Sequence, residues 1–376
     1  MSSLPASQVS SANDLTIRSI TATLVLVPLR RALGTSIMRV TESPLLLIDL
    51  VTEEGITGRA YLFCYLESVG HAVIALIRDV NDVLAGAVAS PAAIRRTLHA
   101  RFALVGAQGP ISFVLAGVDM ACWDAVAIAA KLPLARLLGA PLRPIPAYNS
   151  NGLGLVEPQA AADEALELVA EGFSAIKMRI GRPSAADDLA AVRAVRAAIS
   201  SDVALMVDYN QVLSANAARD RCRQLDDEGL YWIEEPVRHD DYATTAALAA
   251  LLRTPVQIGE NFAGPRAMSE SLHRRASDFV MPDVERIGGV SGWLAAAALA
   301  DTARVEMSSH LFPEVSAHLL AATPTAHWLE YVDWADPIVA DPLRVVDGHV
   351  TPPDRPGTGL VWDADAVARF RRGLNR

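Results

Sequence analysis

ALMVDYNQ, residues 204–211, is a short apolar run that ends on a carboxylate, Asp208. Glu234 in YWIEEP and Glu260 in VQIGEN stand at the same kind of position, where a short apolar segment gives way to a loop. The intervals from 208 to 234 and from 234 to 260 are both 26 residues. One strand, one helix and two loops of a (β/α) barrel use about 25 residues. The spacing therefore predicts three consecutive parallel strands, each carrying an acid at its carboxyl end.

Three acids at one end of a barrel predict a divalent cation. The carboxyl ends of barrel strands converge on one face, so their side chains come close together. Uncompensated negative charge there is costly, and a bound cation removes the cost. Oxygen ligands alone favour a hard ion such as Mg²⁺. The alternative is that each acid only caps the following helix, and the fixed period of three acids argues against it.

Bulk composition limits the class of protein. The chain has 376 residues, of which 51% are apolar and 20% charged, enough to build one large barrel and a smaller companion domain. A net charge of −10 without a clustered Lys/Arg stripe argues against nucleic acid as a partner. No apolar run approaches the roughly 18 residues that would predict a membrane span, so we expect no membrane partner.

The cysteines and the N-terminus bear on location. Cys64, Cys122 and Cys222 are odd in number and far apart, which favours reduced core thiols in a cytoplasmic protein. Residues 1–13 are Ser-rich and have neither the basic nor the apolar region of a signal peptide. We expect them to form a disordered tail.

The order of patterns predicts two domains. Residues 14–143 hold three strand-like segments followed by three helical ones, which indicates an α+β capping domain. Residues 144–341, after a Pro-rich linker, alternate strand and helix and predict a modified TIM barrel. Residues 342–376 form a turn-rich segment that we expect to pack back on the capping domain. The eight predicted barrel strands are 145–150, 174–181, 204–210, 231–236, 256–261, 278–283, 305–310 and 327–332.

The second predicted strand ends in two cations. Lys177 and Arg179 are alternate residues, so both side chains project from the same face, toward the barrel axis. Lysine occurs only at Lys131 and Lys177, although Lys and Arg together number 33. A chain that uses arginine almost everywhere has a reason to keep a lysine at this place, which makes Lys177 a candidate site residue.

The last three predicted strands end in Asp283, His310 and Glu330. An aspartate beside a histidine fixes its tautomer and raises its basicity, as proton transfer requires. Most single histidines are structural, and His318 and His327 are interpreted that way. His310 differs because it ends a barrel strand next to one that ends in aspartate.

These motifs resemble those of the enolase superfamily, and within it the mandelate racemase subgroup with its acid-sugar dehydratase relatives. The resemblance extends over nearly the whole chain and implies a Mg²⁺-dependent barrel enzyme with an N-terminal capping domain. The motifs that carry it are VDYNQ (207–211), WIEEP (232–236), GEN (259–261), MPD…IGGVSGW (281–293) and SSHLFPEVSAHLLAATPTAHWLE (308–330).

The resemblance implies a role for each acid and for the lysine. Asp208, Glu234 and Glu260 match Mg²⁺ ligands. Lys177 matches a lysine that contacts the substrate carboxylate beside the metal. Glu330 matches a protonated acid that hydrogen-bonds that carboxylate as it becomes an enediolate.

The resemblance also implies the groups that move the proton and hold the substrate. His310 and Asp283 match a dyad that transfers a proton on one face of the substrate. Asn210 and Ser150 match polar groups near the substrate hydroxyl and carboxylate. Tyr65 matches a residue that helps to line the pocket.

Arg179 departs from the racemase pattern, which has a second lysine there as the base on the opposite face. A guanidinium stays protonated in proteins and is a poor general base. One base, His310, suits dehydration, because it can take the α-proton and then protonate a departing β-hydroxyl. The alternatives are that the arginine bias of the chain merely replaced a lysine, or that Arg179 binds a second substrate group.

The segment RRALGTSIMRVTES, residues 30–43, matches a loop that is apolar in the racemase. Here it carries Arg30, Arg31 and Arg39. These arginines are either solvated, or one of them points inward. An inward arginine favours a polyhydroxy or dicarboxylic substrate.

The sequence thus predicts an enzyme that removes the α-proton of a small-molecule 2-hydroxycarboxylate with His310 as base. Dehydration of an acid sugar is the leading outcome, and racemisation or epimerisation of a 2-hydroxy acid is the alternative. A third possibility is a homologue that binds a carboxylate without turnover. Symmetric assembly as a homo-oligomer is expected.

Overall fold

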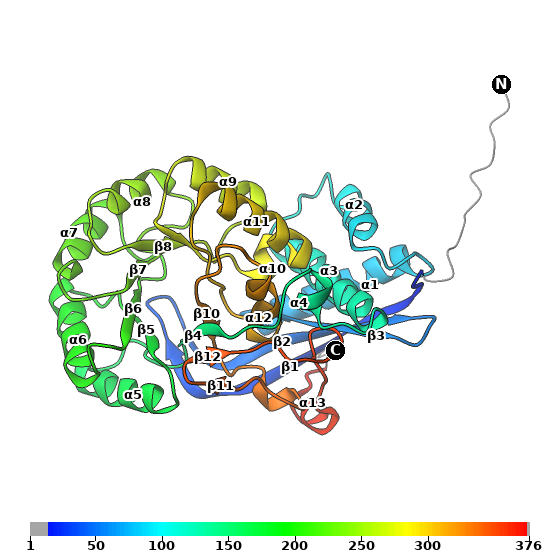
Figure 1. The fold of residues 1–376 in the computed structure, drawn as a ribbon, viewed down its shortest axis with the longest axis horizontal. Coiled ribbons are helices and arrows are strands. Elements are labelled where there is room, and N and C mark those ends of the chain that lie inside the picture. Colours follow the sequence, from blue (N-terminus) through cyan, green and yellow to red (C-terminus); the bar gives the residue numbers. More distant parts are fainter. Residues whose placement is uncertain (1–13, 374–376) are drawn as a thin grey trace.

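The computed structural model describes residues 14–373, arranged as an N-terminal capping domain and a parallel barrel (Figure 1). The capping domain is an antiparallel sheet of order β1-β2-β3 covered by helices. Its elements are β1 (Ile17–Gly34), β2 (Arg39–Thr52), β3 (Thr57–Phe63), α1 (Glu67–Leu84), α2 (Pro91–Arg101), α3 (Pro110–Ala129) and α4 (Leu134–Leu137). The tail predicted for residues 1–13 lies outside the described residues.

Helix α3 is the core helix of the capping domain. Its approach to β3 is so close that a Cβ on Gly58 would lie 2.0 Å from the carbonyl oxygen of Ala121. By length and composition alone α3 is long and apolar enough to cross a membrane, so the expectation that no apolar run has this length was wrong. Most of the apolar part of α3 is nevertheless buried inside the protein, where it packs against the sheet.

The barrel prediction is confirmed. Six parallel strands follow one another in the order β4-β5-β6-β7-β8-β9, and β10 pairs with β4 to close the ring. The strands are β4 (Ile145–Asn149), β5 (Ala175–Arg179), β6 (Ala204–Asp208), β7 (Trp232–Glu234), β8 (Val256–Ile258), β9 (Phe279–Val280) and β10 (Leu329–Tyr331). The helices between them are α5 (Pro158–Ala170), α6 (Ala185–Ala198), α7 (Ala215–Leu225), α8 (Tyr242–Ala249), α9 (Pro265–His273), α10 (Val284–Ile287), α11 (Gly289–Ala303) and α12 (Pro313–Ala321).

The predicted seventh strand, 305–310, is not a regular strand. It joins its neighbours through isolated parallel bridges, including Val280 to Met307 and Asp283 to His310. Met281 and Pro282 lie between these partners on the segment that follows β9, and Pro282 has no N–H to donate to a ladder. The bridge between Asp283 and His310 nevertheless places these two residues side by side.

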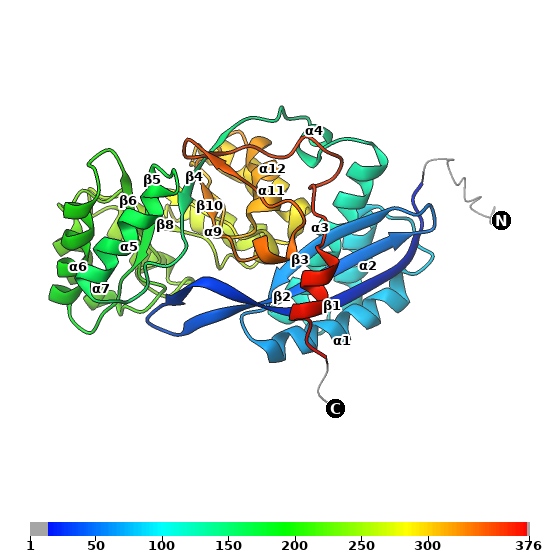
Figure 2. The same ribbon diagram turned by 90° about the horizontal axis from the view of Figure 1, so that it is seen from below.

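The β1–β2 hairpin reaches from the capping domain to the barrel, as seen from below in Figure 2. Beyond a register shift between Pro28 and Leu33, the two strands pair again as far as Gly34 and Arg39. The tip is held by the backbone N–H of Leu155, which donates to the carbonyl of Gly34 at 3.0 Å. The hairpin is thereby fixed over the carboxyl ends of the barrel strands.

The C-terminal segment is divided between the two domains. Its hairpin, β11 (Val345–Val346) and β12 (His349–Val350), pairs antiparallel with β4 and so extends the barrel sheet. The short helix η1 (Asp336–Ile338) precedes this hairpin. After the hairpin, the chain returns to the capping domain, where the indole N–H of Trp362 donates to Asp49 on β2 at 3.0 Å. The last helix, α13 (Ala364–Phe370), contacts β1.

Asp124 ties the C-terminal segment to α3. One carboxylate oxygen accepts hydrogen bonds from the backbone N–H and hydroxyl of Thr358, at 2.6 and 2.8 Å. The other accepts from the backbone N–H of Arg59 at 2.8 Å. Burial raises the pKa of Asp124 to about 6 against the opposing effect of these bonds. The carboxylate joins three parts of the chain that are remote in sequence.

We expect Asp124→Ala to lower the free energy of unfolding by about 2–4 kcal/mol, because it leaves buried donors without a partner. Denaturant titration measures this loss. Asp354→Ala is the matched control, since Asp354 makes only a surface ion pair with Arg136 and such pairs contribute little. Equal unfolding midpoints for the two variants would contradict the structural role of Asp124.

Candidate active site

The ends of β5, β6 and β7 place site residues at one level. Arg179 is the register partner of Asp208, and Asp208 is the partner of Glu234. Glu260 follows the end of β8 by two residues, after Gly259. A Cβ on Gly259 would lie 2.8 Å from Phe262 and 2.9 Å from the backbone of Met281, so glycine is needed to bring Glu260 into the barrel mouth.

Asp208, Glu234 and Glu260 form a buried acidic cluster in which one oxygen from each lies within 4.8 Å of the others. Burial is the main cause that raises the pKa of Glu234 to about 8, with Lys177 opposing it. Neighbouring amides orient the acids: the side-chain amide of Asn210 donates to Asp208 at 2.9 Å. Three buried carboxylates with free oxygen lone pairs are a donor set that fits a hard divalent cation.

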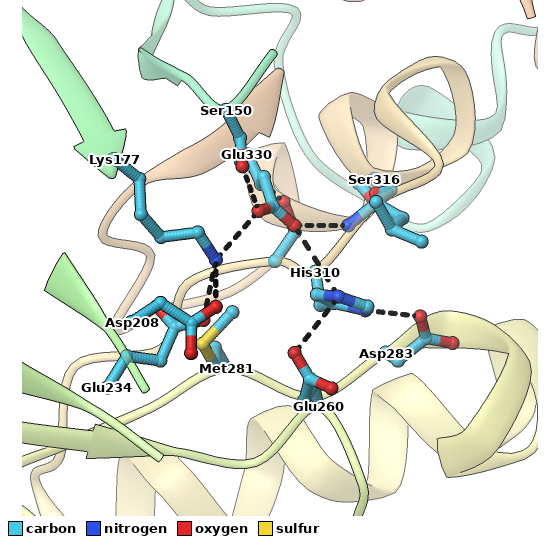
Figure 3. A network of polar contacts seen from close by, with 12 residues as sticks. Ser150, Lys177, Asp208, Glu234, Glu260, Met281, Asp283, His310, Ser316 and Glu330 are labelled. Atoms are coloured by element: carbon cyan, nitrogen blue, oxygen red, sulfur yellow. Dashed lines mark hydrogen bonds and ion pairs between the residues drawn. The ribbon is translucent and has the colours of Figure 1, made fainter. Parts of the chain in front are cut away.

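Lys177 is 1% exposed and lies among carboxylates. Its Nζ is 2.5 Å from Glu234, 2.9 Å from Glu330 and 3.5 Å from Asp208. Burial lowers the pKa of Lys177, but the surrounding carboxylates outweigh it and raise the pKa above its ordinary value. The side chain is therefore a fixed positive charge at the level of the acidic cluster (Figure 3).

His310 and Asp283 form the predicted dyad. Nδ1 of His310 is 2.6 Å from Oδ2 of Asp283, and the other carboxylate oxygen accepts from the backbone N–H of Glu285 at 2.7 Å. Nε2 of His310 faces the site, 3.2 Å from Glu260 and 3.8 Å from Glu330. Burial lowers the pKa of His310, and the negative charges of Glu260 and Glu330 raise it overall.

Glu330 lies between Lys177 and His310 (Figure 3). One of its oxygens accepts from the hydroxyl of Ser150 at 2.6 Å, and the other from the backbone N–H of Leu311 at 2.8 Å. Burial raises the pKa of Glu330, but Lys177 and His310 outweigh burial and lower the pKa to about 2. A substrate carboxylate would bring further negative charge and shift Glu330 toward its protonated form.

Arg179 is 4% exposed, and its guanidinium forms hydrogen bonds with neighbouring residues of the protein. Its Nη1 donates to the carbonyls of Ser150, at 2.7 Å, and Gly152, at 3.3 Å. Its Nη2 donates to the Ser150 hydroxyl at 2.8 Å. Arg179 therefore holds Ser150, which in turn donates to Glu330.

A cavity of about 240 Å³ opens above these residues. Its polar floor is formed by Lys177, Arg179, Asp208, Asn210, Gln211, Glu260, Asn261, Arg286 and His310. Its apolar roof is formed by Leu33, Ile37, Met38, Val40, Phe63, Tyr65 and Trp334. Four of these roof residues, Leu33 to Val40, come from the β1–β2 hairpin, so the capping domain supplies much of the roof.

The arginines of segment 30–43 do not line this cavity. Arg30 pairs with Glu171 and, at 3.3 Å, with Asp333. Arg31 pairs with Glu171 at 2.9 Å, and Arg39 is exposed. The possibility of an inward arginine on the hairpin is therefore wrong, because Arg30 and Arg31 hold the hairpin against acids of the barrel domain.

Sequence reasoning missed Arg286, which does line the cavity. It follows Asp283 by three residues, and its Nη2 donates to the Tyr65 hydroxyl at 2.6 Å. Asn261 and Gln211 were missed as well, although each directly follows a residue that was singled out. A position within three residues of a strand-end acid is the signal that would have identified all three.

Comparisons with known proteins agree with this geometry. Residues 17–139 match the family model of the mandelate racemase and muconate lactonizing enzyme N-terminal domain. Residues 160–366 match the family model described as enolase C-terminal domain-like. Together the two matches cover both domains of the chain.

Individual relatives are similar over most of their length. L-talarate/galactarate dehydratase of Salmonella typhimurium LT2 is 33% identical over 331 residues, which is 87% of this chain and 82% of the relative. A crystal structure of an enolase from the alpha proteobacterium bal199 with bound magnesium is 47% identical, with a TM-score of 0.93 over 95% of this chain and 100% of that one. A Bradyrhizobium enolase complexed with magnesium and mandelic acid is 40% identical, with a TM-score of 0.92 over 96% and 100% of the two chains.

Proposed function

Because this chain belongs to the enolase superfamily, in its mandelate racemase subgroup, we propose that it is a Mg²⁺-dependent enzyme that removes the α-proton of a 2-hydroxycarboxylate, with His310 as base. The arrangement of His310 and Asp283 across the cavity floor from Lys177 supports this proposal. Proteins similar to this chain include dehydratases, which are lyases, and an epimerase, which is an isomerase. For a 2-hydroxycarboxylate, loss of the α-proton can start either dehydration or inversion at the α-carbon.

Several residues would together lower the energy barrier to removal of the α-proton. Mg²⁺ held by Asp208, Glu234 and Glu260 would supply positive charge where the substrate carboxylate becomes an enediolate. Lys177 adds a second fixed charge, and protonated Glu330 donates a hydrogen bond to the same carboxylate.

The base is prepared by its neighbours. Nε2 of His310 takes the α-proton, while Asp283 accepts the hydrogen bond of the Nδ1 proton and stabilises the imidazolium that forms. Ser150, held by Arg179, orients Glu330. His310, Asp283 and Glu330 are the groups needed to remove the α-proton from one face of the substrate.

Dehydration of an acid sugar is the outcome that we propose. The observation that carries it is Arg179, whose guanidinium is bonded to Ser150 and stays protonated in proteins. This leaves His310 as the one proton carrier that we assign. After the α-C–H bond breaks, the imidazolium returns its proton to the β-hydroxyl as the C–O bond breaks. Water leaves, and the enol becomes a 2-keto-3-deoxy acid.

A second candidate is racemisation or epimerisation of a 2-hydroxy acid with an apolar group. The apolar roof favours it, because such a group would be removed from water against Ile37, Met38 and Trp334. The Bradyrhizobium neighbour complexed with mandelic acid gives it further support. A carboxylate-binding homologue without turnover is a third candidate, and the dyad argues against it.

One experiment separates these candidates. A panel of acid sugars and 2-hydroxy acids, including mandelic acid, is incubated with the protein and Mg²⁺ in D₂O and followed by proton NMR. A 2-keto-3-deoxy product establishes dehydration. Deuterium at the α-carbon with loss of chirality establishes racemisation and contradicts the single-base argument from Arg179. Binding without any α-proton exchange establishes the third candidate.

Arg179→Met is expected to lower kcat/KM about 10–100-fold, because Ser150 loses charged hydrogen bonds that are each worth about 1.5–3 kcal/mol. Steady-state kinetics with the substrate identified by the panel measures the loss. Arg219→Met is the control, because Arg219 is exposed on α7. An unchanged kcat/KM in Arg179→Met would show that the contact with Ser150 is dispensable.

Mg²⁺ at 100 times its dissociation constant is expected to stabilise the protein by about 2.7 kcal/mol. Thermal denaturation with and without EDTA detects this as a change in Tm. Asp208→Asn should abolish the change, and Asp220→Asn, an exposed residue of α7, should preserve it. A Tm change that persists in Asp208→Asn would place the cation elsewhere.

We also propose that the protein assembles as a homo-oligomer in a reducing, cytoplasmic compartment. Leu104 and Val105 are apolar and highly exposed in the single chain, and contiguous exposed apolar residues often mark interfaces. All three cysteines are free and buried. Light scattering coupled to size-exclusion chromatography gives the mass in solution, and a monomeric mass would contradict the assembly.

A further inference from the structure

A second cavity, of about 460 Å³, lies between the capping domain and the barrel. One wall is formed by residues of α2 and α3, and the other by the segments that lead into α9 and α11. Its lining residues include Arg95, His99, Asp119, Arg266 and Arg286. The proposed reaction uses none of the capping-domain residues in this group.

The charge around this cavity is mainly positive. Arg95, Arg266 and Arg286 all line it, and none of them has an ion-pair partner within 4.0 Å among residues 14–373. The lining acid is Asp119, whose oxygens accept from the backbone N–H of Ser291 at 2.9 Å and from its hydroxyl at 2.6 Å. The charge of Arg286 is balanced by the nearby carboxylates of Glu260, Asp283 and Glu285. In a chain of net charge −10, Arg95 and Arg266 are therefore the arginines that give this cavity a local field that attracts anions.

The backbone adds a second, independent feature. Helix α9 has nine residues and begins at this cavity, with Gly264 as its N-cap and Pro265 as its first residue. Gly264 has a φ of +80° and supplies no side-chain cap. Pro265 has no N–H and the N–H of Ala267 donates to the carbonyl of Gly264 at 3.2 Å, so the first-turn N–H left without a side-chain cap is that of Arg266. A helix N-terminus presents such N–H groups and partial positive charge to anions.

The far wall is shaped to leave space beside an arginine. Gly288 has a φ of +101°, and a Cβ built on it would lie 3.7 Å from Nη1 of Arg95. A bulkier side chain at position 288 would extend toward the guanidinium that the cavity exposes. Arg286, by contrast, is already bonded to Tyr65, so Arg95 and Arg266 are the arginines available to a ligand.

We propose that this interdomain cavity is a binding site for a small polyvalent oxyanion, of the phosphate or polycarboxylate class, that is separate from the active site. Arg95 and Arg266 neutralise its charge, and the backbone N–H of Arg266 in the first turn of α9 donates a hydrogen bond to it. The site goes beyond the proposed reaction, because its recognition residues take no part in proton transfer. Its existence is therefore testable whatever the substrate proves to be.

The test is calorimetric titration of the full-length, metal-free protein with inorganic phosphate and, separately, with citrate. We expect saturable binding of at least one of them, and Arg95→Gln should weaken it about tenfold or more, because a charged contact is lost. Arg96→Gln is the matched control, since Arg96 is the next residue of α2, is exposed, and does not line the cavity. It should change the dissociation constant less than twofold.

Two further variants complete the design. Lys177→Met, titrated at a temperature where circular dichroism shows it to be folded, should leave the anion affinity unchanged, which excludes binding at the active site. Arg266→Gln should weaken the affinity as Arg95→Gln does. Binding of phosphate alone or of citrate alone identifies the ligand class. Absence of saturable binding, equal weakening by Arg95→Gln and Arg96→Gln, or loss of binding in Lys177→Met would each overturn the proposal.

Discussion

Replacing His310 by asparagine is expected to lower the rate of α-hydrogen exchange with solvent about 10²–10⁴-fold, the usual contribution of a positioned general base. His310 lines the cavity, with its Nε2 on the side of the site and Asp283 bonded to its Nδ1. Asparagine keeps a polar side chain but cannot carry the proton away. The measurement is the loss of the α-proton NMR signal in D₂O with Mg²⁺ and the substrate found by the panel.

Two comparisons give this experiment its meaning. Asp283→Asn keeps the imidazole but removes its negatively charged partner, so we expect a smaller loss of exchange rate. His349→Asn changes an exposed histidine on β12 and should leave exchange as it is in the natural chain. Exchange at the natural rate in His310→Asn would mean that another group takes the proton, and the assignment of the base would be wrong.

The second large effect is on stability. Lys177→Met is expected to lower the free energy of unfolding by about 3–5 kcal/mol in EDTA at neutral pH, the usual cost of breaking a buried ion pair. Its Nζ is 2.5 Å from Glu234 and 2.9 Å from Glu330, and methionine leaves these buried carboxylates facing one another. Denaturant titration measures the loss, and catalytic activity should fall with it.

Lys131→Met is the matched control, because it removes the other lysine of the chain from an exposed position. Adding Mg²⁺ should reduce the difference in free energy of unfolding between the two variants, since the cation brings positive charge to the same carboxylates. Equal unfolding midpoints for Lys177→Met and Lys131→Met in EDTA would contradict the electrostatic role of Lys177.

The sequence was sufficient to predict the barrel and the residues at its strand ends. Short apolar segments at a fixed period leave few other folds, and the register then places Asp208 next to Glu234. The irregular seventh strand was not predicted, because it depends on which backbone N–H groups a neighbouring segment can offer. Pro282 offers none, and this matters only once pairing partners are known.

The directions of the side chains on the β1–β2 hairpin could not be predicted from the sequence, because they also depend on how the strands pair. Alternation along a strand predicts which residues share a face only while the register is continuous. The shift between Pro28 and Leu33 interrupts that alternation. Leu33 consequently lines the cavity, whereas Arg31 pairs with acids of α5, although the two residues are alternate positions on one strand.

The β1–β2 hairpin also bears on how such an enzyme acquires new substrates. Its tip residues Ile37 and Met38 contact the cavity from a domain that contributes neither the acids nor the dyad. Mutation at the tip can therefore alter which molecules fit while leaving the proton-transfer apparatus intact. Substitutions confined to residues 35–40, whether in evolution or in a directed library, can change substrate specificity without changing the residues that transfer the proton.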